Sequence, residues 1–307
     1  MTATPSPKVC VLLSIYNGAR FLKAQIESIA AQKNVSVFIL ARDDGSSDDS
    51  AVIFEETCRG LNIPSRLSKG PNLGAARCFL ELIYQAEREF DCYALADQDD
   101  VWLEDKLDRA AQALGRNPAK PGLYICRQYI TDADLNIIGL SRIPDRLGFG
   151  NAVVQNVAVG AACVFNLEAL KVLTSIPSPQ TLVMHDWWIY LVLSSCGEVT
   201  YDPRPGVYYR QHGGNVVGSE TRFFVRWKKR IANHCTRRAA TCSEQARELL
   251  RLAGPQLTPA DRRLAQELVD AKSSSLARIR LAFSRSFWRQ GVVDDLIWRV
   301  LILLGRY

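Results

Sequence analysis

The sequence predicts an α/β protein with a mixed, mostly parallel sheet flanked by helices. Over about the first 100 residues, short apolar segments rich in β-branched residues alternate with longer segments of helical spacing. Three of the apolar segments end in polar clusters, as strands of a doubly wound sheet do where they meet a ligand. The 307 residues are 48% hydrophobic and 23% charged, which is typical of a folded protein and excludes disordered and collagen-like chains.

The expected elements follow the chain in order. The pattern predicts strands at residues 8–15, 35–41, 63–67 and 92–96, with helices at 18–32, 48–58 and 73–89 between them. The second half is less regular, and we expect strands at 123–130, near 199 and at 207–210, a Gly-Ala segment at 159–166 and a helix at about 184–195. Because the carboxyl ends of parallel strands meet at one edge, the polar clusters at 14–17, 43–47 and 97–100 are expected to line one crevice.

Charge is distributed unevenly along the chain. Residues 222–307 contain 18 Lys and Arg against 7 Asp and Glu, a net charge of +11, and the rest of the chain has a net charge of −5. We therefore expect an α/β domain at 1–218 and a basic helical region at 219–307, whose last helix is predicted at 283–304. Its aromatic and Arg residues are typical of an interfacial amphipathic helix that binds an anionic membrane, but a solvated or packed helix explains them as well.

The cysteines and the N-terminus indicate a cytoplasmic location. The nine Cys are odd in number and form no CxxC pair, so neither a disulfide framework nor a zinc knuckle is expected. The start MTATPSPKVC lacks the charged and apolar regions of a signal peptide, and no segment approaches the roughly 20 apolar residues that span a bilayer. We expect a chain that does not cross the membrane.

Two acidic motifs follow predicted strands. Asp43 and Asp44 begin DDGSSDD, whose carboxylates can accept hydrogen bonds from a base imide and from ribose, although a turn with a helix N-cap is the alternative. Asp97, Asp99 and Asp100 lie within DQDD, after the apolar segment CYALA. Because clustered carboxylates repel one another, this motif favours a hard divalent cation, Mg²⁺ or Mn²⁺, or else is an acidic surface turn.

Asp186 is the candidate general base. It lies in HDWW at the start of an apolar helix, where a partly dry environment raises the proton affinity of a carboxylate. A helix-start carboxylate beside core Trp side chains is the alternative. His212, in YRQHGGN, is either a ligand or a structural histidine.

In combination, seven motifs resemble one family. SIYNGARFLKAQIESIAAQ, RDDGSSDDS, GPNLGAARCF, ADQDDVW, GAACVFN, MHDWW and YYRQHGGNVVG occur in this order within about residues 8–218. They resemble the inverting family 2 glycosyltransferases of GT-A fold, and more narrowly the bacterial rhamnosyltransferases of surface polysaccharide (O-antigen) synthesis. The resemblance implies transfer of L-rhamnose from dTDP-rhamnose to a lipid-linked or growing oligosaccharide at the inner face of the cell membrane, with a UDP-hexose as the alternative donor.

The resemblance also implies roles for single residues. Asp186 matches the base, Asp99 the principal metal carboxylate, and His212 a histidine that completes the metal site. Residues implied to bind the nucleotide sugar are Ser14, Asn17, Asp43, Asp44, Asn72, Arg77 and Asp97. Asp100, His185 and Trp187 are secondary candidates, and since the family often has Glu before the base, the role of His185 is open.

Electrostatic stabilisation and general base catalysis explain the reaction that the resemblance implies. Two other functional classes, a nucleotidyltransferase and an RNA-binding protein, are the alternatives. A divalent cation stabilises the departing nucleoside diphosphate, a base deprotonates the acceptor on the opposite face of the sugar, and a single displacement inverts the anomeric configuration. A nucleotidyltransferase would need a Gly-rich, basic loop after the first strand, of which SIYNGAR is a poor version. An RNA-binding protein would leave the acidic motifs unexplained, so no nucleic-acid partner is expected.

Overall fold

The computed structural model describes residues 6–212 and 242–307, which form two compact units. Of the described residues, the first unit contains 6–143, 158–175 and 197–212, and the second contains 144–157, 176–196 and 242–307. The chain therefore passes between the units several times. The boundary that the sequence pattern predicts at residue 218 lies outside the described residues.

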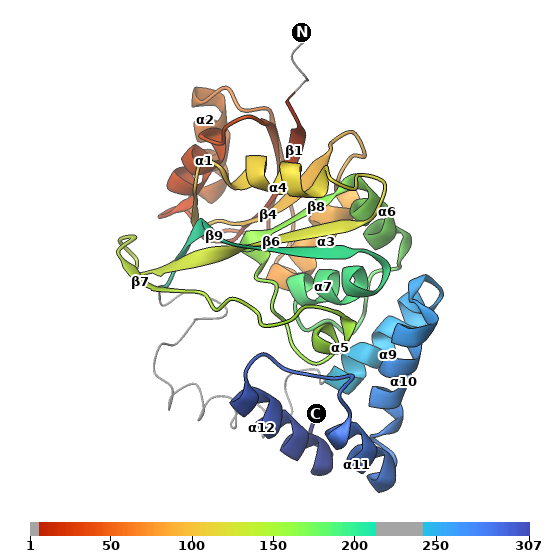
Figure 1. The fold of residues 1–307 in the computed structure, drawn as a ribbon. Coiled ribbons are helices and arrows are strands. Elements are labelled where there is room, and N and C mark those ends of the chain that lie inside the picture. The colour runs from red at the N-terminus through yellow and green to blue at the C-terminus, as the bar shows by residue number, and fades with distance from the viewer. Residues whose placement is uncertain (1–5, 213–241) are drawn as a thin grey trace. The chain divides into compact units, whose positions relative to one another are not determined.

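The first unit is built on a mixed, mostly parallel sheet (Figure 1). In the described residues the strand order is β3-β2-β1-β4-β8-β6-β9-β5, with β7 paired to β6. The strands are β1 (Lys8–Ile15), β2 (Ser36–Asp43), β3 (Ser65–Lys69), β4 (Cys92–Asp97), β5 (Val101–Trp102), β6 (Gly122–Thr131), β7 (Ile137–Leu140), β8 (Cys163–Asn166) and β9 (Glu198–Arg210). The first four are mutually parallel, which confirms the α/β prediction.

Helices cover this sheet, so its central strands are buried. They are α1 (Leu22–Ala30), α2 (Ser50–Gly60), α3 (Ala75–Gln85), α4 (Lys106–Leu114) and α6 (Leu167–Ser175). All residues from Val9 to Leu13 are at most 1% exposed, as expected for a parallel strand with both faces covered. The short strands β5 and β7 and the helices α4 and α6 have no counterpart in the sequence prediction.

Strand β9 differs from its prediction. The sequence suggests two strands, near 199 and at 207–210, because Pro203 and Pro205 interrupt the pattern. The structure has one strand whose register against β6 shifts around Arg127. This irregularity accommodates the prolines within a continuous strand.

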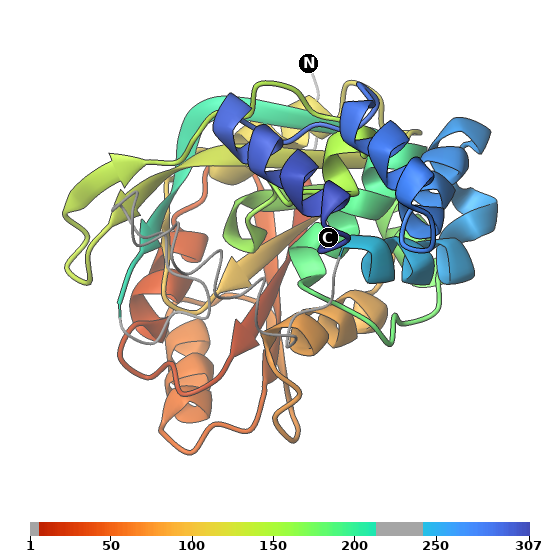
Figure 2. The same ribbon diagram turned by 90° about the horizontal axis from the view of Figure 1, so that it is seen from below.

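The second unit is helical. Its helices are α5 (Phe149–Ala152), α7 (His185–Cys196), α9 (Cys242–Ala253), α10 (Pro259–Asp270), α11 (Ser275–Phe283) and α12 (Val292–Leu303) (Figure 2). The predicted single helix at 283–304 is wrong, because α11 ends at Phe283 and α12 begins only at Val292. Gly291, which precedes α12, has a φ of +84°, a left-handed conformation that glycine adopts without a Cβ penalty.

Candidate active site

The loops after β1, β2 and β4 meet at one edge of the sheet. In the parallel register Ile15 pairs with Asp43, and Ser14 pairs with both Arg42 and Asp97. The predicted meeting of the three polar clusters is therefore confirmed for the first unit. These loops follow the carboxyl ends of the strands, where α/β sheets bind their ligands.

Reciprocal hydrogen bonds join the loops after β1 and β2. The Asn17 N–H donates to Ser46 Oγ at 2.9 Å, and the Ser47 N–H donates to Asn17 Oδ1 at 2.8 Å. The Gly18 N–H donates to Ser50 Oγ at 2.8 Å. Asn17 has a φ of +48°, a left-handed conformation that Asn tolerates. The predicted site residue Asn17 thus holds two loops in a fixed relation.

Asp44 binds a third segment of the chain. Its carboxylate accepts the Leu73 N–H at 3.0 Å and the Gly74 N–H at 2.8 Å, and it forms an ion pair with Arg42. Arg42 also donates to Pro71 O at 3.0 Å. Asp44 is only 2% exposed, so its carboxylate is occupied by protein donors that position the segment GPNLG.

The other residues implied for the nucleotide sugar lie around these loops. Asp43 Oδ1 accepts the Ser46 N–H at 2.9 Å, and the Ser14 hydroxyl donates to Cys78 Sγ at 3.1 Å. Asn72 and Arg77 are exposed, in the segment that Asp44 holds and in the first turn of α3.

Asp99 and His212, which are 113 residues apart in sequence, contact each other. His212 Nε2 lies 2.8 Å from Asp99 Oδ2, and both side chains are partly exposed, at 19% and 17%. Arg210 supports this pair, because its Nε donates to Asp99 O at 2.7 Å and its guanidinium carbon lies 4.6 Å from the centre of the Phe21 ring. The end of β9 thus brings an imidazole to the acidic loop after β4.

Asp100 points into the protein. It is fully buried, and its Oδ1 accepts the Arg210 N–H at 3.0 Å. Burial, followed by the neighbouring charges of Asp99 and Asp97, raises the pKa of Asp100 well above its usual value. Asp100 therefore supports the loop from inside the protein, while the Asp99 side chain is partly exposed and contacts His212.

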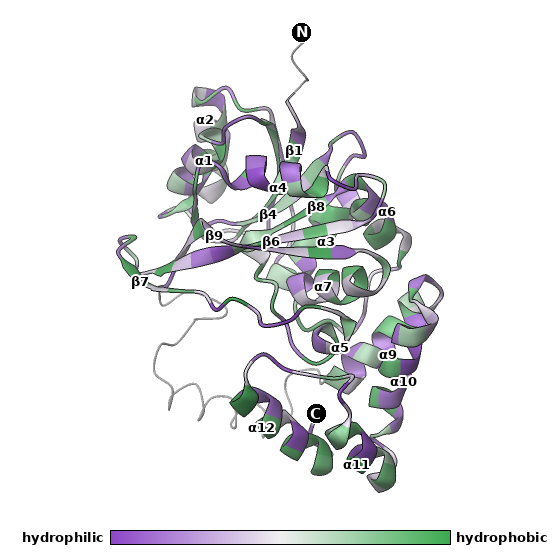
Figure 3. Cartoon of the chain, viewed as in Figure 1, coloured by the Kyte–Doolittle hydropathy of each residue, from purple (hydrophilic) through white to green (hydrophobic). Residues whose placement is uncertain are grey.

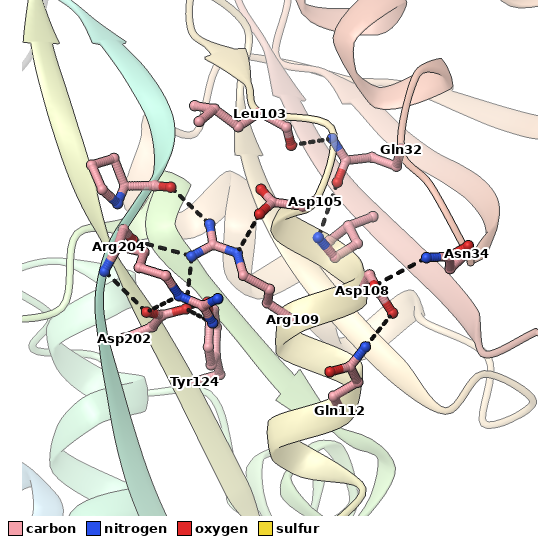
Figure 4. Close-up of polar contacts among 12 residues, drawn as sticks. Gln32, Asn34, Leu103, Asp105, Asp108, Arg109, Gln112, Tyr124, Asp202 and Arg204 are labelled. Carbon is pink, nitrogen blue, oxygen red and sulfur yellow. Dashed lines mark hydrogen bonds and ion pairs between the residues drawn. The ribbon is translucent and has the colours of Figure 1, made fainter.

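A polar network fixes β9 in the first unit (Figure 4). Arg109 of α4 donates to Asp202 Oδ2 and to Pro205 O, both at 2.7 Å. The Tyr124 hydroxyl donates to the same Asp202 oxygen at 2.7 Å, and Arg204 Nε donates to Asp202 Oδ1 at 3.1 Å. These contacts hold the strand whose end supplies Arg210 and His212.

Asp186 lies in the second unit, at the start of α7. Its Oδ1 accepts from Asn156 Nδ2 at 3.0 Å and from the Trp187 N–H at 2.6 Å, and the residue is 7% exposed. Trp187 Nε1 donates to Ala152 O at 2.7 Å, which joins α7 to α5. Burial lowers the pKa of His185 to about 3, so this imidazole is neutral at physiological pH.

Comparison with known proteins points to one family. Residues 10–158 match the family model described as Glycosyl transferase family 2. This segment of the chain is therefore similar to family 2 glycosyltransferases. Over 228 residues it is 27% identical to the dTDP-rhamnosyl transferase RfbG of Shigella flexneri, covering 71% of this chain and 77% of that protein. It is 22% identical over 221 residues to the UDP-Glc:alpha-D-GlcNAc-diphosphoundecaprenol beta-1,3-glucosyltransferase WfaP of Escherichia coli, covering 71% and 83%.

Solved structures confirm that the protein has the GT-A fold. S. aureus TarS 1-349 in complex with UDP-GlcNAc has a TM-score of 0.58 at 14% identity, covering 98% of this chain and 82% of that chain. The mannosyltransferase PcManGT from Pyrobaculum calidifontis, in complex with GDP-Man and Mn²⁺, has a TM-score of 0.53 at 16% identity, covering 98% and 86%.

Asp99 and His212 fit a divalent cation that is bound together with other ligands. In the described part of the chain, no group of three or more His, Cys, Asp and Glu side chains is arranged to hold a metal ion. Asp99 and His212 provide one oxygen and one nitrogen donor side by side. Mg²⁺ and Mn²⁺ commonly bind one or two protein side chains together with substrate phosphates and water, and the imidazole suits Mn²⁺ better than Mg²⁺.

Sequence reasoning missed two residues of the first unit. Gln98 accepts the Tyr16 N–H at 2.7 Å and donates to Tyr16 O at 2.8 Å, and so links the loops after β1 and β4. Its position between the carboxylates of DQDD was the available signal. Lys106 is fully buried, which lowers its pKa to about 7, and its Nζ donates to Ala161 O at 2.6 Å. No signal in the sequence distinguished this lysine from a surface residue.

Proposed function

We propose that this protein is a metal-dependent, inverting family 2 glycosyltransferase that transfers L-rhamnose from dTDP-rhamnose. The contact between Asp99 and His212, beside the joined loops after β1 and β2, carries the metal-dependent part of the proposal. The likeness to RfbG, a dTDP-rhamnosyl transferase, supports the donor. A UDP-hexose is the alternative, supported by WfaP, because thymine and uracil differ by one methyl group, worth about 1 kcal/mol in a pocket.

The first unit would bind and orient the donor. Asp99 Oδ2 and His212 Nε2 would hold the cation, whose chemistry when bound is to stabilise the charge that develops on the diphosphate as it leaves. Asp44 would act indirectly, because its carboxylate holds the segment that contains Asn72. The exposed Asn72 and Arg77 would then face the nucleotide diphosphate.

Asp186 of the second unit would act as the general base. Asn156 and the Trp187 N–H donate to one carboxylate oxygen and orient the group. The carboxylate would accept the proton of the acceptor hydroxyl as that hydroxyl attacks the anomeric carbon opposite the leaving diphosphate. A single displacement of this kind inverts the anomeric configuration.

The acceptor would be a lipid-linked or growing oligosaccharide of surface polysaccharide synthesis, reached from the cytoplasmic face of the membrane. The name of WfaP specifies a diphosphoundecaprenol-linked acceptor for that protein, which supports this class of acceptor here. In residues 6–212 and 242–307, no helix is long and apolar enough to span a bilayer. The enzyme would therefore reach a lipid-linked acceptor as a peripheral protein.

The test is an assay of the full-length enzyme with dTDP-rhamnose and with UDP-glucose, each with and without a chelator. We expect dTDP release and a glycoside of opposite anomeric configuration to the donor, both lost on metal removal. Asp186→Asn should slow transfer by about 100-fold or more while donor affinity is kept, because the base acts only on the acceptor. Release of pyrophosphate, chelator-resistant turnover, or faster turnover with UDP-glucose would each contradict a part of the proposal.

A further inference from the structure

Helices α9 and α10 of the second unit have ordinary surfaces. Every exposed residue of α9 is charged: Glu244, Arg247 and Arg251. After its first two residues, α10 exposes only polar side chains, namely Arg262, Arg263, Gln266, Glu267 and Asp270. Their apolar residues, such as Leu249 and Leu268, are buried, as in surface helices of soluble proteins.

Helix α12 has the opposite polarity. Every exposed residue within it is apolar, with exposures between 44% and 77%: Val292, Val293, Leu296, Val300 and Leu303. Four of them recur at spacings of four, four and three residues, which places them on one side of the helix. Figure 3 shows strongly hydrophobic residues at both ends of α12.

The polar side chains of α12 instead form hydrogen bonds and ion pairs within the second unit. Arg299 Nε donates to Asp295 Oδ2 at 2.7 Å, and its guanidinium donates to Ser284 O at 3.1 Å. Trp298 and Ile302 are buried on the inner side, at 2% and 0% exposure. The inner side of α12 is thus fixed by packing and hydrogen bonds, and the apolar side faces outward.

Helix α11, which packs against α12, has a similar stripe. Leu276, Ile279 and Phe283 are 59%, 48% and 78% exposed and lie at spacings of three and four residues, with the exposed Arg280 among them. We call these three residues and the five of α12 the apolar stripes. Contiguous exposed apolar residues on a soluble protein mark an interaction surface.

Charge and length indicate the occupant of this surface. Residues 272–307 contain seven Lys and Arg against two Asp and Glu, and Arg280, Arg285 and Arg306 are exposed. Apolar side chains beside exposed Arg are the composition of a helix that lies in a membrane interface of anionic lipid. The 12 residues of α12 extend over about 18 Å, too short to cross a core of about 30 Å.

We propose that the apolar stripes of α11 and α12 dock on an anionic membrane surface and insert their side chains into the headgroup region. This docking proposal extends the proposed function. It rests on the proposed function only for the identity of the acceptor. It supplies the contact that a peripheral enzyme needs to act on a lipid-linked acceptor.

Contacts within the second unit connect the stripes to Asp186. Asn151 of α5 donates to Trp288 O at 3.1 Å, in the segment between α11 and α12, and accepts from the Tyr190 hydroxyl of α7 at 3.0 Å. A Cβ added to Gly150 would lie 1.9 Å from Ser286 O, so this segment packs tightly on α5. Helices α11 and α12 and the helix α7, whose first turn contains Asp186, therefore belong to one packed unit.

The test is flotation of the full-length protein with phosphatidylcholine vesicles, with and without phosphatidylglycerol. Val300→Glu should weaken partition to the anionic vesicles about tenfold or more, because it replaces an apolar group that would enter the headgroup region with a charge repelled by the lipid. The matched control is Val52→Glu on α2 of the first unit, since Val52 is 52% exposed and Val300 is 55% exposed. This control should partition as the wild type does, and both variants should keep the wild-type melting temperature.

Other outcomes overturn the docking proposal. Equal flotation of Val300→Glu and wild type would assign binding to another part of the chain. If neither protein floats with vesicles, and if the wild type is a dimer that Val300→Glu converts to a monomer, the apolar stripes are a contact between two copies of the chain. Transfer to a short soluble acceptor should be the same in both variants, whereas transfer to a vesicle-bound acceptor should fall only in Val300→Glu. Failure of the proposed donor would leave the flotation result unchanged, so the two proposals fail separately.

Discussion

The loops after β2 and β4 both present carboxylates at the same edge of the sheet, yet the structure uses them differently. Asp44, after β2, is 2% exposed and is bound by Arg42 and by two backbone N–H groups. Asp99, after β4, has a side chain that is 17% exposed and contacts His212. The Asp44 carboxylate is bound by protein donors, whereas the Asp99 carboxylate is partly exposed and accessible to a ligand.

This difference shows that an acidic motif does not define the role of its residues. A carboxylate surrounded by protein donors gains its stability from them and offers little to a ligand. A carboxylate beside an imidazole, with part of its surface open, combines donor atoms that divalent cations prefer. Substitutions in the two loops should therefore affect different properties.

The largest effect is expected for Asp99→Ala. Loss of the carboxylate should reduce transfer by about 1,000-fold, because one of the two side chains proposed to bind the cation is gone. Donor affinity measured by calorimetry should lose its dependence on added Mn²⁺, while the melting temperature stays close to that of the wild type. If Asp99→Ala keeps a donor affinity that depends on Mn²⁺, Asp99 does not bind the cation, and the proposed difference in role between the loops after β2 and β4 is wrong.

Asp44→Asn should act on stability first. The substitution leaves the buried Arg42 without its charged partner, and the free energy of unfolding should fall by about 3 kcal/mol, as measured by urea denaturation. Asp49→Asn is the matched control, since Asp49 is exposed in the same loop, and it should change stability by less than about 0.5 kcal/mol. Unchanged stability of Asp44→Asn, together with lost donor affinity, would instead support the direct binding of the nucleotide sugar by Asp44 that the resemblance implies.

The smallest effect is expected for Gln98→Ala. This change removes both hydrogen bonds to the Tyr16 backbone and should weaken donor binding by about tenfold, because two neutral hydrogen bonds contribute about 1–2 kcal/mol together. Turnover at saturating donor should change little. If kcat falls as strongly as after Asp99→Ala, Gln98 acts on the reaction and not only on loop position.

The sequence predicted the first half of the fold well. The strands at 8–15 and 92–96 coincide with β1 and β4 to within one residue, because both faces of these strands are covered and their sequences are continuously apolar. The polar clusters at the strand ends predicted where the loops meet. The last helix was predicted poorly, because the apolar and Arg residues of 283–304 continue past Gly291, where the backbone breaks the helix.

The sequence by itself determined the strand pattern, the acidic clusters and the motifs that resemble family 2 glycosyltransferases, since these depend on residues close together along the chain. Only the tertiary structure decided that Asp44 holds a segment 29 residues away, that His212 reaches Asp99 across 113 residues, and that α12 turns its apolar side outward. The physical reason is that a side chain's partners, and the side of a helix that is covered, are set by the packing of elements distant in sequence, which no local pattern encodes.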